Sequence, residues 1–145
     1  MLLTFSFNIM DQTTIPPRIL IVDDNDAAAD IAAELLGLYN YKTAVAYSGA
    51  EGLQTAMAFM PDVVLLDLGM PGMDGYQVAQ ALRALPAFQE VALIAFTAWD
   101  DPATLARTRS VGFDQHITKP SSLDEILNAI HSASAMRGGF HQKTA

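Results

Sequence analysis

Five short apolar segments recur along this chain, and a segment with helical character follows each of them. We expect strands at residues 18–22, 42–46, 62–67, 91–97 and 115–118. The longer runs are continuously apolar, which is typical of strands that are covered on both faces. Strands that alternate with helices pair in parallel, with helices on both sides of the sheet. The sequence therefore predicts an α/β, doubly wound fold with a five-stranded parallel sheet.

Helix start signals follow the strands. The predicted caps are Asn25 or Asp26, Ser48 with Glu51, Asp74, Asp101 with Pro102, and Ser122 with Glu125. Gly112 is expected to end the fourth helix. In the first helix, residues 25–39, the apolar side chains share one face: Ala28, Ile31, Leu35 and Leu38. The third helix has a predicted core face of Val78, Ala81, Leu82 and Leu85.

The size and composition of the chain indicate one domain. A chain of 145 residues with 51% hydrophobic content suffices for a single core. We expect an N-terminal tail at 1–17, the domain at 18–135 and a C-terminal tail at 136–145. Met10 is an alternative start to Met1, because an ordinary polar leader follows it.

The charge and residue usage exclude several function classes. There is no cysteine, so disulfides and thiolate chemistry are excluded and a cytoplasmic location is favoured. A formal net charge of −8 argues against nucleic-acid binding, because phosphate backbones are bound by Lys and Arg. The apolar N-terminal run is too short to span a membrane and lacks signal-peptide features.

Polar side chains stand where four of the five predicted strands end. These residues are Asp23 and Asp24, Asp67, Thr97 and Lys119. Because parallel strands end at one edge of the sheet, these side chains are expected to meet there. Three carboxylates would repel one another without a cation, so the sequence predicts a Mg²⁺ site, with Mn²⁺ as a substitute. A carboxylate, a metal, an ammonium and a hydroxyl together suit phosphoryl transfer.

Four motifs, in order, carry a resemblance to a known family. The segments ILIVDDN, VVLLDLGMPGMDG, LIAFTA and HITKP resemble those of response-regulator receiver domains of two-component signalling, particularly the stand-alone chemotaxis type. The resemblance covers residues 18–135. It implies a flavodoxin-like (βα)5 fold and a single-domain switch rather than an enzyme with external substrates. It also implies a histidine kinase or a histidine phosphotransfer protein as the phosphoryl donor.

The resemblance further implies a role for each site residue. Asp67 would be the phosphoacceptor, and the metal ligands would be Asp23, Asp24, Asp67 and the backbone carbonyl of Gly69. Lys119 would pair with Asp67 and its phosphoryl group.

Other positions near the site would respond to phosphorylation. Thr97 would move its hydroxyl onto the phosphoryl group, and Ala98 would leave room for the donor. His116 stands where the family usually has Tyr or Phe as the switch residue, and Trp99 occupies a variable position that flanks the site. The Lys119–Pro120 peptide bond is expected to be cis, as in the family.

The signal would leave through residues about 101–135, which would contact an effector protein or a second copy of the chain. A role as phosphate sink or shuttle for a histidine phosphotransfer protein stays open. A haloacid-dehalogenase-type phosphohydrolase is disfavoured because Gly69 stands where its second Asp belongs. A nucleotide binder is disfavoured because no glycine-rich loop follows the first strand.

Overall fold

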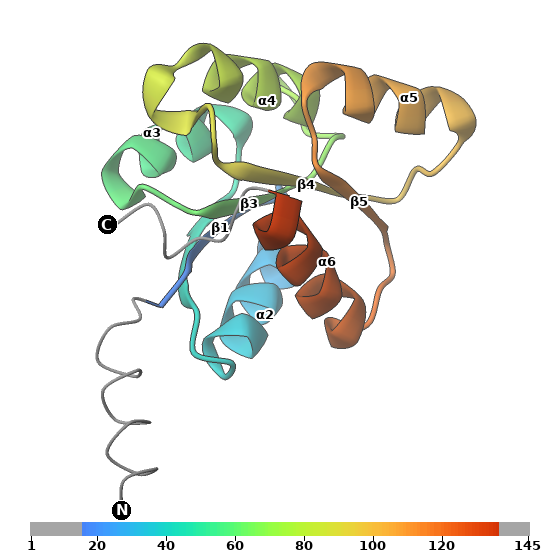
Figure 1. Cartoon of the computed structure of the whole chain (residues 1–145). Helices are drawn as coiled ribbons and strands as arrows, with labels where there is room; N and C mark the ends of the chain where they lie inside the picture. Colours follow the sequence, from blue (N-terminus) through green and yellow to red (C-terminus); the bar gives the residue numbers. More distant parts are fainter. Residues whose placement is uncertain (1–15, 137–145) are drawn as a thin grey trace, which may run out of the picture.

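The structure is a computed structural model that describes residues 16–136, and its five strands form one sheet (Figure 1). The strand order is β2-β1-β3-β4-β5, and all four neighbouring pairs are parallel. In chain order the elements are β1 (Arg18–Val22), α2 (Asp26–Gly37), β2 (Lys42–Ala46), α3 (Gly49–Phe59), β3 (Val63–Leu66), α4 (Gly75–Ala84), the short 3₁₀ helix η1 (Pro86–Phe88), β4 (Ala92–Thr97), α5 (Pro102–Val111), β5 (Gln115–Thr118) and α6 (Leu123–Met136). The doubly wound fold is confirmed.

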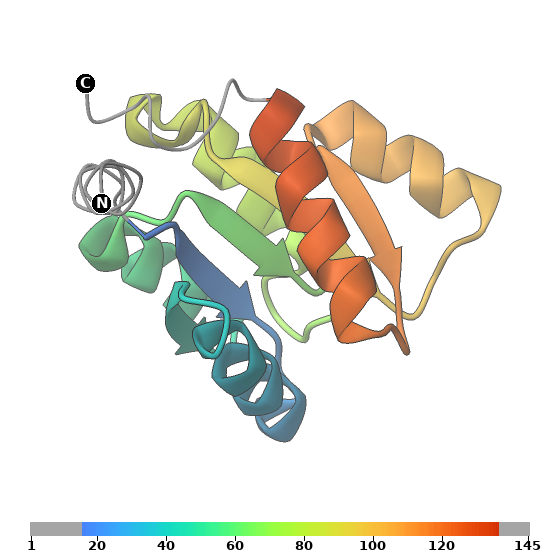
Figure 2. The same ribbon diagram turned by 60° about the horizontal axis from the view of Figure 1, so that its bottom comes forward.

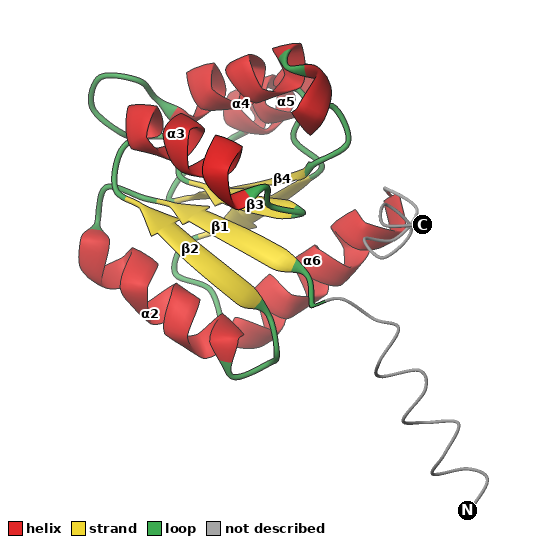
Figure 3. Cartoon of the chain, turned by 90° about the vertical axis from the view of Figure 1, so that its left-hand side faces the viewer, coloured by secondary structure: helices red, strands yellow, loops and turns green. Residues whose placement is uncertain are grey.

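Helices cover both faces of the sheet. Figure 3 shows α2 and α6 on one side and α3, α4 and α5 on the other. Alternate residues of β3 belong to the two cores: Val63 and Leu65 pack with the α2 and α6 side, and Val64 and Leu66 pack with the opposite side. All four are fully buried. The double cover explains why the run is continuously apolar.

The helix caps form as predicted. The side chains of Asn25, Ser48, Asp74 and Asp101 each accept a hydrogen bond from a backbone N–H in the first turn of the following helix. Ser122 and Glu125 make the reciprocal bonds of a capping box. Gly112 ends α5 with a φ of 104°, a value that glycine adopts without a side-chain clash.

The face of the first helix that was predicted to be buried, with Ile31, Leu35 and Leu38, is exposed in the structure. Ile31 is 58% exposed and Leu38 is 80% exposed, although both belong to the predicted apolar stripe. The buried residues of α2 are instead Ala29, Ala32, Ala33 and Leu36. Three of these four are alanines, whose small side chains let the helix lie close to the sheet, while Ile31 and Leu35 are exposed.

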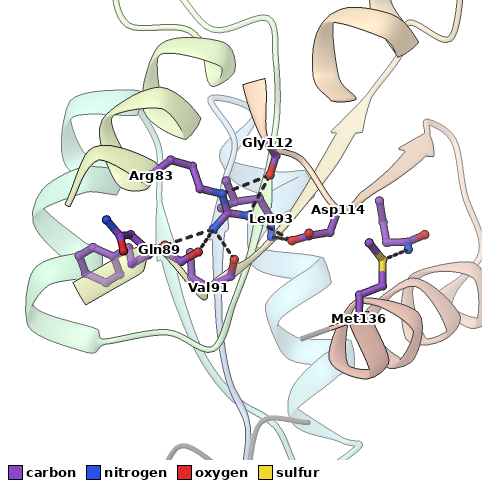
Figure 4. Close-up of polar contacts among 9 residues, drawn as sticks. Arg83, Gln89, Val91, Leu93, Gly112, Asp114 and Met136 are labelled. Atoms are coloured by element: carbon purple, nitrogen blue, oxygen red, sulfur yellow. Dashed lines mark hydrogen bonds and ion pairs between the residues drawn. The ribbon is translucent and has the colours of Figure 1, made fainter. Parts of the chain in front are cut away.

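Arg83 of α4 joins three segments at the edge of the sheet where β4 and β5 begin (Figure 4). Its guanidinium donates to the carbonyls of Phe88, Gln89, Val91 and Gly112, and it forms an ion pair with Asp114 at 3.2 Å. The Asp114 carboxylate also accepts from the Leu93 N–H at 2.9 Å. One planar side chain therefore fixes the entry to both strands.

The predicted tails lie mostly outside the described residues, as do Met1 and Met10. Within residues 16–136, no helix has the length and apolar character needed to cross a membrane.

Candidate functional site

Three carboxylates converge at the carboxyl edge of the sheet. Val22 of β1 lies opposite Leu66 of β3 in the parallel register, so the residues that follow them emerge side by side. The Asp67 N–H donates to the Val22 carbonyl at 2.9 Å. Oxygen atoms of Asp23, Asp24 and Asp67 all lie within 4.8 Å of one another. In Figure 2 the arrowheads of β1, β3 and β5 point to this side of the molecule.

Lys119 supplies positive charge from the loop that follows β5. Its ammonium lies 2.6 Å from Asp23 Oδ2 and 3.9 Å from Asp67 Oδ2. It also lies 5.1 Å from the centroid of the Phe96 ring. Asp23, rather than Asp67, is therefore the nearer partner of Lys119 in this structure. The predicted cis peptide bond between Lys119 and Pro120 is confirmed.

The environment of Asp67 favours its neutral form. Burial raises the pKa of the Asp67 carboxyl above its ordinary value, and Lys119 opposes this effect. The nearby charges of Asp23 and Asp24 raise it further. A bound cation would offset both the burial and the repulsion between the carboxylates.

The three carboxylates fit a hard divalent ion. Mg²⁺ takes oxygen ligands at about 2.1 Å, so neighbouring ligand oxygens of an octahedral site lie about 3 Å apart. Asp23 is buried and its Oδ1 accepts the Asn25 N–H at 2.9 Å, which orients its carboxylate. Asp24 is exposed.

The remaining predicted residues lie around this cluster. Thr97 is fully buried at the end of β4, and its carbonyl accepts the Lys119 N–H at 2.7 Å. Ala98 follows it and is exposed. Gly69 is also exposed, and its N–H lies 3.4 Å from Asp67 Oδ1. The structure thus brings Thr97, Gly69 and Lys119 to the same edge as the carboxylates.

His116 contacts the loop after β4 and helix α5. It lies on β5, and its Nε2–H donates to the Trp99 carbonyl at 2.8 Å. Its Nδ1 lies 3.5 Å from the hydroxyl of Thr108, the only residue of α5 that is buried. The imidazole therefore links the loop after β4 to α5.

The sequence interpretation missed a groove beside Lys119. Its volume is about 600 Å³, and it runs between α2, the end of β4 and the loop before α6. Ile31 and Leu35 of α2 form one wall, and Ala98, Lys119 and Pro120 belong to its lining. The predicted apolar stripe of α2 contained this signal, because its members Ile31 and Leu35 line the groove and do not belong to the buried core.

Comparison with known proteins identifies the family. Residues 19–131 match the model of the response regulator receiver domain. The chain is 31% identical over 116 residues to the transcriptional regulator RpaA of Synechocystis, covering 80% of this chain and 48% of that protein. It is 30% identical over 113 residues to sporulation initiation phosphotransferase F of Bacillus subtilis, covering 78% of this chain and 90% of that protein.

Solved structures of receiver domains have a similar fold. A CheY-like receiver domain protein from Methanospirillum hungatei superimposes with a TM-score of 0.79 at 24% identity, covering 86% of this chain and 98% of that one. The chain spans about half the length of several curated relatives, which are transcriptional regulators. The family-model match covers most of the chain, and we conclude that the chain belongs to the response regulator receiver domain family.

Proposed function

We propose that this chain is a phosphorylation switch in which Asp67 accepts a phosphoryl group from a phosphohistidine of a partner protein. The observation that carries the proposal is the convergence of three carboxylates and Lys119 around Asp67. Receiver domains are regulatory switches in two-component signalling, and they interact with histidine kinases and phosphotransfer proteins. The acidic cluster suits the Mg²⁺ that such domains bind.

The transfer needs few protein groups. An Asp67 carboxylate oxygen attacks phosphorus, the P–N bond breaks, and its electron pair stays on the imidazole nitrogen, which takes up a proton. Asp23, Asp24, Asp67 and the Gly69 carbonyl would hold Mg²⁺, whose charge would neutralise phosphoryl oxygens. Lys119 is close enough to move from Asp23 towards those oxygens.

Two small groups complete the environment of the transferred phosphoryl. The Thr97 hydroxyl lies at the same edge and can donate to a phosphoryl oxygen after a rotation of its side chain. The neighbouring Ala98 has only a methyl group and leaves an opening for the donor imidazole. We assign Thr97, Ala98 and His116 the role of reporting the phosphorylated state.

The groove along α2 is where we place the phosphohistidine-bearing partner. It is lined by Lys119 and Ala98, so a partner seated there would hold its histidine near Asp67. Its wall is apolar and exposed, which suits the apolar face of a partner helix. The occupant that we propose is thus a helix of a histidine kinase or phosphotransfer protein.

The output surface is proposed at residues 101–135. Within it, α5 is anchored weakly, because Thr108 is its only buried residue. The Thr108 hydroxyl lies 3.5 Å from the His116 ring, so a movement of His116 would change the position of α5. An effector protein or a second copy of the chain would read this change. We propose a cytoplasmic location, which the absence of cysteine supports.

A phosphate shuttle is the second candidate. One relative of similar length carries the name phosphotransferase, and this favours a chain that passes its phosphoryl group onward. A shuttle would return the phosphoryl group to a second histidine protein. Under the switch function, the phosphorylated chain would instead bind an effector.

The test is phosphorylation by a small-molecule phosphodonor such as acetyl phosphate, followed by intact mass. We expect the wild type to gain one phosphoryl group with Mg²⁺ and none with a chelator. Asp67→Asn should gain none, and Asp124→Asn, a change of an exposed carboxylate on α6, should behave as the wild type. An unmodified wild type, or an Asp67→Asn protein that is modified equally, would contradict the assignment.

A further inference from the structure

The imidazole of His116 has a polar contact on each side. Its Nε2 lies 2.8 Å from the Trp99 carbonyl in the loop after β4, and its Nδ1 lies 3.5 Å from the Thr108 hydroxyl oxygen on α5. The Thr108 hydroxyl itself donates to the Leu105 carbonyl at 2.9 Å. The ring therefore bridges two segments, and one of its two neighbours has already used its only proton.

The protons available for these contacts depend on the charge of the ring. A carbonyl only accepts, so Nε2 carries a proton, and in the neutral imidazole Nδ1 then carries none. Because the Thr108 proton is directed to Leu105, an unprotonated Nδ1 would face an oxygen lone pair. In the imidazolium form both ring nitrogens donate, and Nδ1–H can bond to Thr108 Oγ1. Only the protonated ring satisfies all three contacts at once.

The contact with Thr108 matters because α5 has few buried attachments. Thr108 is its only buried residue. On its outer part, the Arg107 guanidinium lies 3.8 Å from the centroid of the Tyr76 ring of α4. Arginine keeps its charge at every pH at which proteins are ordinarily folded, so this second attachment does not vary with pH. His116 is thus the attachment of α5 that a change of pH near neutrality can alter.

The other end of the bridge reaches the phosphoacceptor loop. The Trp99 indole lies against Gly69, where an added Cβ atom would lie 2.5 Å from Cη2 of the ring. The loop that His116 holds is therefore in contact with the segment that follows Asp67. A change in the state of His116 acts between this loop and α5.

Charges of both signs surround the ring. Arg109 of α5 and Asp114, next to the start of β5, line the same cavity of about 320 Å³ as the imidazole. In the loop after β4, Asp100 and Asp101 follow Trp99 directly. The end of α6 lines the cavity with Met136, which carries no charge. The ring is half-buried and borders this cavity, so it can exchange its proton with solvent.

We propose that His116 is a pH-sensitive latch on α5. The protonated ring bonds to both Trp99 and Thr108 and holds the helix against the loop after β4. When the Nδ1 proton passes to water, the bond to Thr108 is lost and the helix is loosened, with no other bond formed or broken. The output surface that contains α5 would then be more mobile above neutral pH than below it. The latch acts in the unphosphorylated chain, so its failure and that of the proposed function are distinguishable.

The test is a double-mutant cycle between His116 and Thr108 at two pH values, about pH 5.5 and about pH 8, which bracket the ordinary titration of histidine. Denaturant unfolding of the full, unphosphorylated chain gives the unfolding constant. Because the protonated ring makes the extra bond, its stabilising effect is present at the lower pH and lost as the pH rises. We expect Thr108→Val to raise the unfolding constant about three to ten times more at the lower pH than at the higher one, which corresponds to one hydrogen bond.

Matched variants separate the latch from a general effect of pH. In a His116→Phe background, Thr108→Val should have the same effect at both pH values. Thr108→Ser keeps the hydroxyl and should behave as the wild type, and so should His131→Gln, a change of an exposed histidine on α6. A Thr108→Val effect that is equal at both pH values in the wild type would overturn the latch. An effect that still varies with pH in His116→Phe would also overturn it, since another group would then be responsible.

Hydrogen exchange provides a measurement that does not need Thr108→Val to fold. Comparing wild type with His116→Phe at the same pH cancels the intrinsic pH dependence of exchange. The α5 amides of the wild type should be more protected than those of His116→Phe at the lower pH, and this difference should shrink at the higher pH. A difference of the same size at both pH values would overturn the latch.

Discussion

At the residue scale, Asp67 lies where burial and neighbouring carboxylates lower the stability of the folded protein, in a position suited to phosphoryl transfer. Its side chain is only 13% exposed, and two further carboxylates lie within 4.8 Å of its oxygens. Lys119 offsets part of this repulsion, but its ammonium lies nearer to Asp23. Burial and like charges raise the pKa of Asp67, which means that its ionised form is destabilised. Without a cation, the folded state therefore contains repulsion between carboxylates that Lys119 relieves only in part.

We therefore predict that Asp67→Asn stabilises the metal-free protein. Two like charges about 4 Å apart near a protein surface repel by about 4 kcal/mol, and Lys119 offsets most of this repulsion. A net gain of about 1 kcal/mol should raise the melting temperature by about 2–4 °C. Mg²⁺ should raise the melting temperature of the wild type by more than that of Asp67→Asn. Thermal unfolding with Mg²⁺ or with a chelator measures both effects. Glu34→Gln, an exposed change on α2, is the control, and an Asp67→Asn protein less stable than wild type would contradict the prediction.

The convergence of these residues could be predicted because parallel strands end at one edge. The order of residues along the chain then suffices to place Asp23, Asp67 and Lys119 together. The preference of Lys119 for Asp23 could not be predicted, because it depends on side-chain distances. The contact between Trp99 and Gly69 was equally hidden, since it requires the path of the loop after β4.

At the scale of single elements, α2 shows how periodicity can mislead. Three members of the predicted stripe, Ala28, Ile31 and Leu35, do share one side of the helix, but they line the groove beside Lys119. The packed side uses Ala29, Ala32 and Leu36. Alanine is compatible with both buried and exposed positions, so its spacing carries little signal. Sequence periodicity could identify the helix and its cap, but it could not identify which of two apolar sides faces the sheet.

This arrangement predicts a separation of docking from folding. Ile31→Gln should change stability by about 0.5 kcal/mol or less, because the side chain is 58% exposed and Gln favours helices. Transfer from a phosphohistidine protein should slow about tenfold if burial of Ile31 contributes near 1.4 kcal/mol to docking. Transfer from acetyl phosphate should not change, since this donor needs no groove.

Met57→Gln provides the matched control for Ile31→Gln. Met57 is 57% exposed on α3, in the helix layer across the sheet, so both transfer rates should stay at wild-type values. Equal slowing with both donors in Ile31→Gln would indicate a damaged site, and unchanged rates would remove the groove from the docking proposal.

At the scale of the whole molecule, one edge of the sheet carries the candidate site and the opposite edge carries stabilising contacts. The carboxyl ends of β1, β3 and β4 present the acidic cluster and Thr97, whereas the opposite ends of β4 and β5 are held by Arg83. Arg83 lies 31 positions from Asp114 in the sequence, so no local sequence pattern predicts their contact. Its guanidinium offers several donors in one plane, which a lysine cannot reproduce.

Because Arg83 and the acidic cluster lie at opposite edges of the sheet, we predict that Arg83 stabilises the fold without affecting phosphorylation of Asp67. Arg83→Met would leave the mostly buried carboxylate of Asp114 and several carbonyls without this donor, at a cost of about 2–4 kcal/mol. The melting temperature should fall by about 6–12 °C. Arg83→Lys should recover only part of the loss, and Arg109→Met, on the exposed side of α5, should cost little. The contacts of Arg83 lie at the edge of the sheet away from Asp67. Acetyl phosphate should therefore still phosphorylate folded Arg83→Met at the wild-type rate well below its melting temperature. A Lys variant as stable as the wild type would show that a single charge, rather than the planar set of donors, holds the two strands.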